Sequence, residues 1–95
     1  MSYSDWVSFN KENVNKSPTK SGVYFLGSEH ETTYIGASHN IQERLNEHLD
    51  SSDPCIKSTV SFCYHETRFP EAEEEKQLTA FQYEHGRLPT CNKTG

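Results

Sequence analysis

Two short runs of strand-forming residues, separated by a turn-like segment, dominate the first third of the chain. Residues 22–26 (Gly-Val-Tyr-Phe-Leu) and 32–36 (Thr-Thr-Tyr-Ile-Gly) are rich in β-branched and aromatic side chains. Residues 27–31 between them are polar and include a glycine, so the pattern predicts a β-hairpin. Residues 1–20 are mostly polar with scattered aromatic positions, and we interpret them as an N-terminal clamp on the edge of the domain.

The apolar spacing then changes to that of helices. Residues 41–49 carry an apolar side chain at every fourth position after a run of capping residues, which predicts an amphipathic helix. Alternating apolar and polar residues across 56–64 predict a third strand. Pro70 suits the first turn of a second long helix and Gly86 its end. The order β-β-α-β-α predicts an α+β fold in which a three-stranded antiparallel sheet is flanked by helices.

Length and composition set limits on this fold. Ninety-five residues correspond to one domain, 1–95, whose core must be small. Hydrophobic residues make up only 32 % of the chain, but an aromatic content of 12 % offsets this because each ring buries a large area. No apolar run approaches the roughly 20 residues that span a bilayer, and residues 1–9 lack a signal-peptide pattern. We therefore expect a cytoplasmic protein without membrane contact.

The three cysteines, Cys55, Cys63 and Cys91, are odd in number and widely spaced. This pattern favours reduced thiols over a disulfide framework. A zinc site built from these cysteines with His65 and His85 is a weaker alternative, because no pair has the tight spacing of structural zinc ligands.

The net charge of -5 opposes nucleic-acid binding, which normally uses clustered Lys and Arg. About half of the acidic residues, however, lie in residues 71–75 and 29–31. Because net charge is a sum over the whole surface, it leaves room for a local basic groove.

Six short motifs follow one another along the chain. They are Gly22-Val23-Tyr24; Tyr34-Ile35-Gly36; Asn40-Ile41 with Arg44-Leu45 and His48; Glu75-x-x-Leu78; Tyr83; and Pro89 with Asn92. In this order they resemble the signature of the GIY-YIG nuclease family. The similarity covers residues 22–92, the core motif region, and implies a metal-dependent enzyme that hydrolyses phosphodiester bonds.

The two motif tyrosines lie on the two strands of the predicted hairpin, where they can share one pocket. The resemblance implies that Tyr24 helps to deprotonate the attacking water and that Tyr34 supports the same site. A phenol with a pKa near 10 is a poor base, so this role requires positive charge nearby. The alternative is that both tyrosines are amphipathic core residues.

Arg44 and His48 are four residues apart and share one face of the predicted helix. The planar guanidinium of Arg44 suits a phosphate oxygen, and His48 could donate a proton or position the water. Alternatively, Arg44 is a solvated charge paired with Glu43 or Glu47, and His48 is a half-buried packing residue.

One of the clustered glutamates is the candidate metal ligand. On a helical wheel Glu75 falls near the middle of the apolar arc of the last helix, whereas Glu73 points outward and Glu74 lies at the edge. An inward carboxylate needs a partner, and Mg²⁺ or Mn²⁺ is a suitable one. The register of the family also selects Glu75. The alternative, an acidic first helical turn favoured by the helix dipole, explains Glu71, Glu73 and Glu74.

Asn92 closes the motif. The resemblance implies that it steadies the site through hydrogen bonds, whereas the alternative is a turn residue. Taken together, we expect an endonuclease acting on DNA, including branched or damaged DNA, with specificity from DNA structure or from a protein partner. The rival hypothesis is a module that binds nucleic acid or protein without cleaving.

Overall fold

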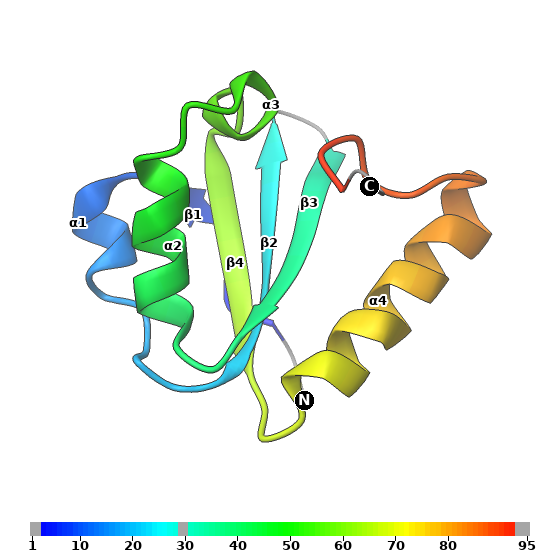
Figure 1. Cartoon of the computed structure of the whole chain (residues 1–95), viewed down its shortest axis with the longest axis horizontal. Coiled ribbons are helices and arrows are strands. Elements are labelled where there is room, and N and C mark those ends of the chain that lie inside the picture. Colours follow the sequence, from blue (N-terminus) through cyan, green and yellow to red (C-terminus); the bar gives the residue numbers. More distant parts are fainter. Residues whose placement is uncertain (1–2, 29–30, 93–95) are drawn as a thin grey trace.

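The computed structural model of the chain describes residues 3–28 and 31–92 (Figure 1). The elements, in order, are β1 (Val7–Ser8), α1 (Lys11–Val14), β2 (Gly22–Ser28), β3 (Glu31–Ser38), α2 (Ile41–Leu49), α3 (Pro54–Lys57), β4 (Ser61–Glu66) and α4 (Pro70–His85). The hairpin of the sequence prediction is thus present as β2 and β3. Part of its predicted turn, residues 29–30, lies outside the described residues.

The sheet is antiparallel, with the strand order β1-β4-β2-β3. The α+β class is confirmed, but the prediction of three strands is wrong. The additional strand, β1, pairs Val7 with Phe62 and Ser8 with Ser61 at the edge of β4. Two residues are too short to produce a periodic pattern, so their pairing depends on the strand that they meet.

The third predicted strand also begins later than expected. Residues 54–57 form α3 instead, because Pro54 suits a first helical turn and the side chain of Asp53 accepts a hydrogen bond from the backbone N–H of Cys55 at 2.9 Å. β4 starts only at Ser61. The apolar Ile56 is still buried, but it packs from a helix.

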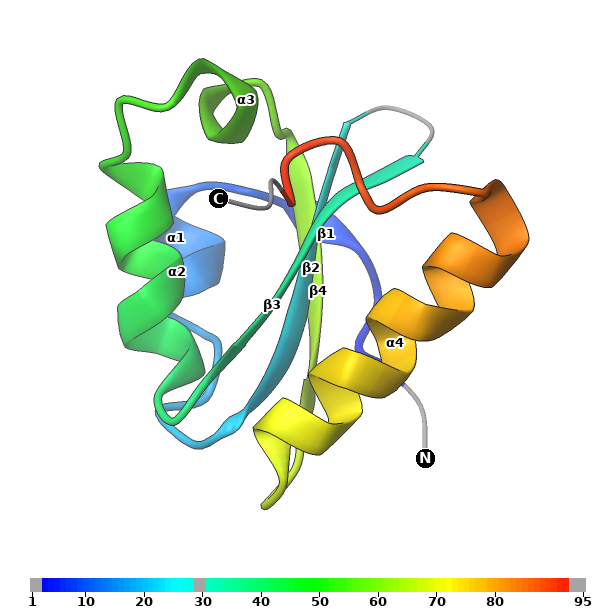
Figure 2. The same cartoon turned by 45° about the vertical axis from the view of Figure 1, so that its right-hand side comes forward.

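The helices cover both faces of the sheet. α1, α2 and α3 lie on one side and α4 lies alone on the other (Figure 2). Because side chains alternate along a strand, Tyr24 and Leu26 face α2, where they join a core with Leu45 of that helix. Gly22 permits close approach, since an added Cβ would lie 2.6 Å from the Cδ1 atom of Ile41.

A disulfide between Cys55 and Cys91 corrects the expectation of reduced cysteines; within the described residues only Cys63 is free, and it is buried. The two half-cystines are 36 residues apart in sequence, but α3 and the C-terminal segment meet at a Cα–Cα distance of 5.7 Å. Their sulfurs are therefore not available to a zinc ion. Throughout the described part of the chain, no helix is long and apolar enough to cross a membrane.

Candidate active site

The two motif tyrosines meet on the α2 side of the sheet. Tyr24 in β2 pairs with Gly36 in β3, and Tyr34 stands two residues before Gly36 on the same face. Their ring centroids are 6.1 Å apart. A Cβ added to Gly36 would lie 2.5 Å from the hydroxyl oxygen of Tyr24 and 2.8 Å from the ring of Tyr34. The absent side chain of Gly36 therefore provides the space in which the two rings lie.

His48 joins this pair from α2. Its Nε2 atom is 2.8 Å from the hydroxyl oxygen of Tyr24, and its ring lies edge-on to Tyr34 with centroids 5.1 Å apart. The side chain is buried, with 8 % of its surface exposed. Burial lowers the pKa of His48 to about 4, and the positive charge of Arg44 adds to this shift. His48 is therefore neutral near pH 7, so a neutral imidazole faces the phenol.

Tyr24 is fully buried, and its burial raises the pKa of the phenol above the ordinary value. Tyr34 adds to this increase, whereas the guanidinium of Arg44 opposes it. The phenol consequently holds its proton in the absence of substrate. Any role as a base requires that the proton leave to a neighbouring group.

Arg44 extends from α2 at the exposed edge of this cluster. Its Nη1 atom forms an ion pair with Oε1 of Glu47 at 2.6 Å, and 45 % of the Arg44 side chain is exposed. This is the ion pair that the alternative interpretation expected. The pairing coexists with the site, however, since the charge of Arg44 also acts on Tyr24 and Tyr34. An exposed ion pair of this kind is weak, so a phosphate can compete for the guanidinium.

Asn92 binds the edge strand beside Tyr34. Its Oδ1 atom accepts the backbone N–H of Ile35 at 2.8 Å, and its Nδ2 atom donates to the carbonyl of the same residue at 2.9 Å. The backbone N–H of Cys91 donates to the carbonyl of Thr33 at 2.7 Å. The backbone is thus held on both sides of Tyr34, and Asn92 makes the hydrogen bonds that a steadying role requires.

Glu75 does not lie where the helical wheel placed it. It is exposed, whereas Glu74 is half-buried, so the prediction that Glu75 occupies the inward arc of α4 is wrong. The error arises because Tyr83, counted in that arc, is 93 % exposed. Glu75 lies one turn from Glu71, whose carboxylate pairs with His39 at 3.2 Å in the turn before α2. This stripe of α4 therefore borders the end of the sheet where α2 begins.

Glu74 is the competing carboxylate. Burial raises its pKa, and the nearby charge of Glu71 adds to the increase. Glu73 is engaged differently, since it accepts hydrogen bonds from the hydroxyl of Tyr3 at 3.0 Å and from Gln77 at 2.8 Å. Within residues 3–28 and 31–92, Glu75 takes part in no ion pair.

The described residues of this site agree with only one mode of binding a divalent cation. No group of three His, Cys, Asp or Glu side chains that could hold a metal occurs in the described residues. Mg²⁺, however, usually keeps several waters and binds through one or two carboxylates together with substrate phosphates. A single exposed glutamate such as Glu75 agrees with this mode, whereas a structural zinc ion would need more protein ligands. Glu75 is on α4, on the face of the sheet opposite α2 and Arg44 (Figure 2).

Two contributions to the site were missed at the level of sequence. Gly36 was recognised only as part of a motif, although its position directly after Tyr34-Ile35 on a strand is a signal for close approach. The disulfide of Cys55 and Cys91, which ties the segment of Asn92 to α3, left no sequence signal.

Comparisons with known proteins agree with this geometry. A family model described as the GIY-YIG catalytic domain matches residues 20–84. The GIY-YIG N-terminal endonuclease domain of UvrC from Thermotoga maritima, bound to its catalytic divalent cation magnesium, superposes with a TM-score of 0.63 at 18 % identity. That match covers 88 % of this chain and 100 % of the other. A point mutant of that domain covers 90 % of this chain and 100 % of the other at 17 % identity, again with a TM-score of 0.63.

At these identities the structural matches show a shared fold. A search of curated proteins finds no match. The family model covers well over half of the chain, and its range includes both tyrosines, Arg44 and His48. The chain therefore belongs to the GIY-YIG family.

Proposed function

We propose that this protein is a metal-dependent endonuclease that hydrolyses phosphodiester bonds in DNA. The observation that carries the proposal is the hydrogen bond between the Tyr24 hydroxyl and Nε2 of a neutral His48, beside Tyr34 and Arg44. A binding module has no need for a buried phenol–imidazole pair next to an arginine. Hydrolysis needs both a route for the proton of water and positive charge near the phosphate.

The proton route begins at Tyr24. Because burial raises the pKa of this phenol, Tyr24 stays protonated and cannot accept a proton from water by itself. His48 offers a relay, since its neutral Nε2 atom at 2.8 Å can accept the phenolic proton while the phenol oxygen takes a proton from the attacking water. Because the pKa of His48 is lowered to about 4, this relay needs an attacking water that a bound divalent cation would make more acidic. This assignment requires the tautomer of His48 that carries its proton on Nδ1. Tyr34 packs against both rings and keeps them in position.

Arg44 supplies the positive charge. When a substrate phosphate approaches, the guanidinium exchanges part of its contact with Glu47 for the phosphoryl oxygens. It then offsets the negative charge that grows during attack. Its proximity to Tyr24 also favours the transient phenolate, because the same charge lowers the pKa of the phenol.

Glu75 is the residue that we assign to the metal, as an exposed carboxylate on the stripe of α4 that borders the start of α2. The UvrC domain was solved with magnesium, and Mg²⁺ or Mn²⁺ is the cofactor we infer here. A bound divalent cation would polarise a phosphoryl oxygen and make the attacking water more acidic. Asn92 contributes indirectly, by holding the strand that bears Tyr34.

The test is cleavage of linear and branched DNA in Mg²⁺ or Mn²⁺ by wild type, Arg44→Ala, His48→Ala and Glu75→Ala. We expect wild type to cleave and each variant to lose at least about 100-fold in rate. Glu74→Ala is the matched control on the same helix and should retain most of the activity. Loss in Glu74→Ala with full activity in Glu75→Ala would transfer the metal site to Glu74. DNA binding without any cleavage by the wild type would instead favour a non-cleaving binding module.

A further inference from the structure

A cavity lies on the face of the sheet opposite Tyr24 and His48. α4 approaches the sheet at its N-terminal end and diverges from it toward its C-terminal end (Figures 1 and 2). Between the helix and the strands lies a half-open pocket of about 560 Å³. This volume is typical of sites that bind a ligand or a set of large side chains.

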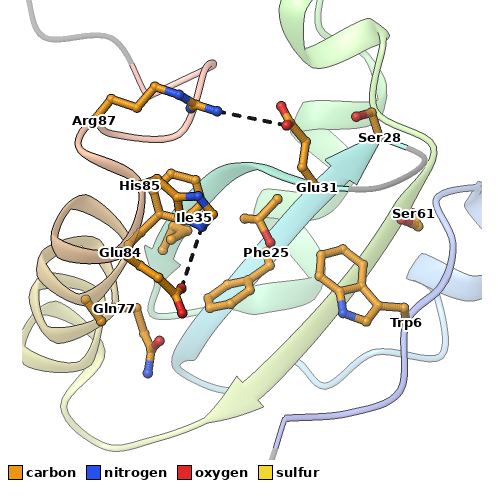
Figure 3. Close-up of a pocket in the computed structure, with 13 residues that line it drawn as sticks. Trp6, Phe25, Ser28, Glu31, Ile35, Ser61, Gln77, Glu84, His85 and Arg87 are labelled. Atoms are coloured by element: carbon orange, nitrogen blue, oxygen red, sulfur yellow. Dashed lines mark ion pairs between the residues drawn. The ribbon is translucent and has the colours of Figure 1, made fainter.

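Aromatic rings line the pocket (Figure 3). Phe25 and Ile35 form its floor on the strands and Trp6 forms one wall, and Phe81 of α4 also lines it. The ring of Trp6 is held against β2, because an added Cβ on Gly27 would lie 3.0 Å from it, yet Trp6 remains 46 % exposed. An exposed large ring held in place on one side is a preformed apolar surface, and such surfaces mark interaction sites.

Among the charged residues that line the pocket, the acidic Glu31 and Glu84 outnumber the basic Arg87, and the other glutamates of α4 lie outside the lining. α4 carries five glutamates and one lysine: Glu71, Glu73, Glu74, Glu75 and Glu84, with Lys76. At the mouth, Arg87 is the cation, and it reaches toward Glu31 at 3.9 Å while its guanidinium lies over the ring of Phe81. The whole chain has a net charge of -5. Together these charges favour a cationic over an anionic occupant.

We propose that this pocket, bounded by Trp6, Phe25 and Phe81, docks a basic segment of a partner protein that inserts one or more large apolar side chains. The aromatic cavity requires an apolar side chain to fill it, and the acidic helix beside it favours positive charge on either side of that anchor. A basic partner would also bring the positive charge that an acidic nuclease lacks for approaching DNA, so this consequence rests on the proposed function.

Other occupants fit less well. A nucleic-acid strand would bring its phosphates close to Glu31 and Glu84 at the rim. A second copy of the chain would bring the same net charge of -5 and the same acidic α4 to the contact. The charge complementarity thus selects a basic protein segment.

Trp6 makes the proposal easy to test, because it is the single tryptophan of the chain and it lines the pocket. The probe is the peptide acetyl-Lys-Leu-Phe-Lys-amide, added to the full chain while Trp6 fluorescence is recorded. Two matched peptides serve as controls, one with both lysines replaced by glutamate and one with Leu-Phe replaced by Ala-Ala. We expect a saturable change with the first peptide at millimolar concentration or below, at least about tenfold weaker binding of each control, and weakening by salt.

Two variants test the location. Ala80→Phe places a ring in the pocket from an exposed position on α4 and should weaken binding at least tenfold. Glu84→Gln should weaken it about two- to fivefold, whereas Glu12→Gln, the same charge change on α1, should not. Equal binding of the acidic peptide, unchanged binding by Ala80→Phe, or no saturable change would overturn the proposal. The titration contains neither DNA nor metal, so its failure would leave the nuclease proposal standing.

Discussion

A buried histidine that stays neutral in the folded chain makes stability depend on pH, and His48 is such a residue. Folding lowers its pKa from about 6.5 to about 4, mainly through burial. As the pH falls, the unfolded chain takes up the proton at a higher pH than the folded chain does. The contribution of the neutral imidazole to the free energy of unfolding is therefore fully present only above about pH 6.5. It is lost progressively as the pH falls from about 6.5 toward about 4.

The magnitude follows from the two pKa values. Each pKa unit corresponds to about 1.4 kcal/mol, so the complete shift is worth about 3 kcal/mol. Between pH 7 and pH 5 this single site should lower the free energy of unfolding by about 2 kcal/mol. That is a large share of the stability of a small domain, which is on the order of 5 to 15 kcal/mol.

Urea unfolding at pH 7 and pH 5, followed by Trp6 fluorescence, measures this loss. His48→Gln removes the titrating group while its side-chain carbonyl can still accept the hydroxyl of Tyr24. Between pH 7 and pH 5, we expect the free energy of unfolding of the variant to fall by about 2 kcal/mol less than that of wild type. His85→Gln, an exposed histidine on α4, should behave as wild type does. The same loss in wild type and His48→Gln would refute the assignment of a buried, neutral imidazole.

Three further predictions concern the surroundings of the site. Gly36→Ala puts a methyl group against the hydroxyl of Tyr24. The rate of DNA cleavage should therefore fall at least about 100-fold and the free energy of unfolding by about 1–3 kcal/mol, and near-normal cleavage would contradict the tight packing. Glu47→Gln frees Arg44 from its ion pair and should strengthen DNA binding about two- to fivefold by anisotropy at low salt, and weaker binding would count against the role of Arg44. Cys55→Ser removes the cross-link that closes a 36-residue loop, so it should lower the free energy of unfolding, measured by thermal unfolding, by about 4 kcal/mol. No loss would show that the cross-link does not stabilise the fold.

The parts of the site that the sequence predicted depend on short-range geometry. Side chains alternate along strands, so the hairpin pattern by itself places the two tyrosines on a common face. The spacing of four between Arg44 and His48 places both on one side of α2 in the same way.

The parts that it missed depend on contacts between distant segments. The two residues of β1 become a strand only because β4 offers an edge, and the disulfide forms only because α3 and the C-terminal segment meet in the fold. The orientation of Glu75 was wrong for a related reason. α4 has no consistent apolar stripe, since Tyr83 at one end is exposed, so the sheet and not the sequence pattern decides which side faces inward.

The central claim is that Tyr24, His48 and Arg44 form a cleavage site rather than a binding surface. The most direct measurement is the rate of DNA cleavage in Mg²⁺ by wild type and by His48→Ala, with DNA affinity recorded for both. We predict that the variant binds DNA within about threefold of wild type but cleaves it at least about 100-fold more slowly. Equal cleavage rates in the two proteins, or no cleavage by wild type on any DNA substrate, would contradict the claim.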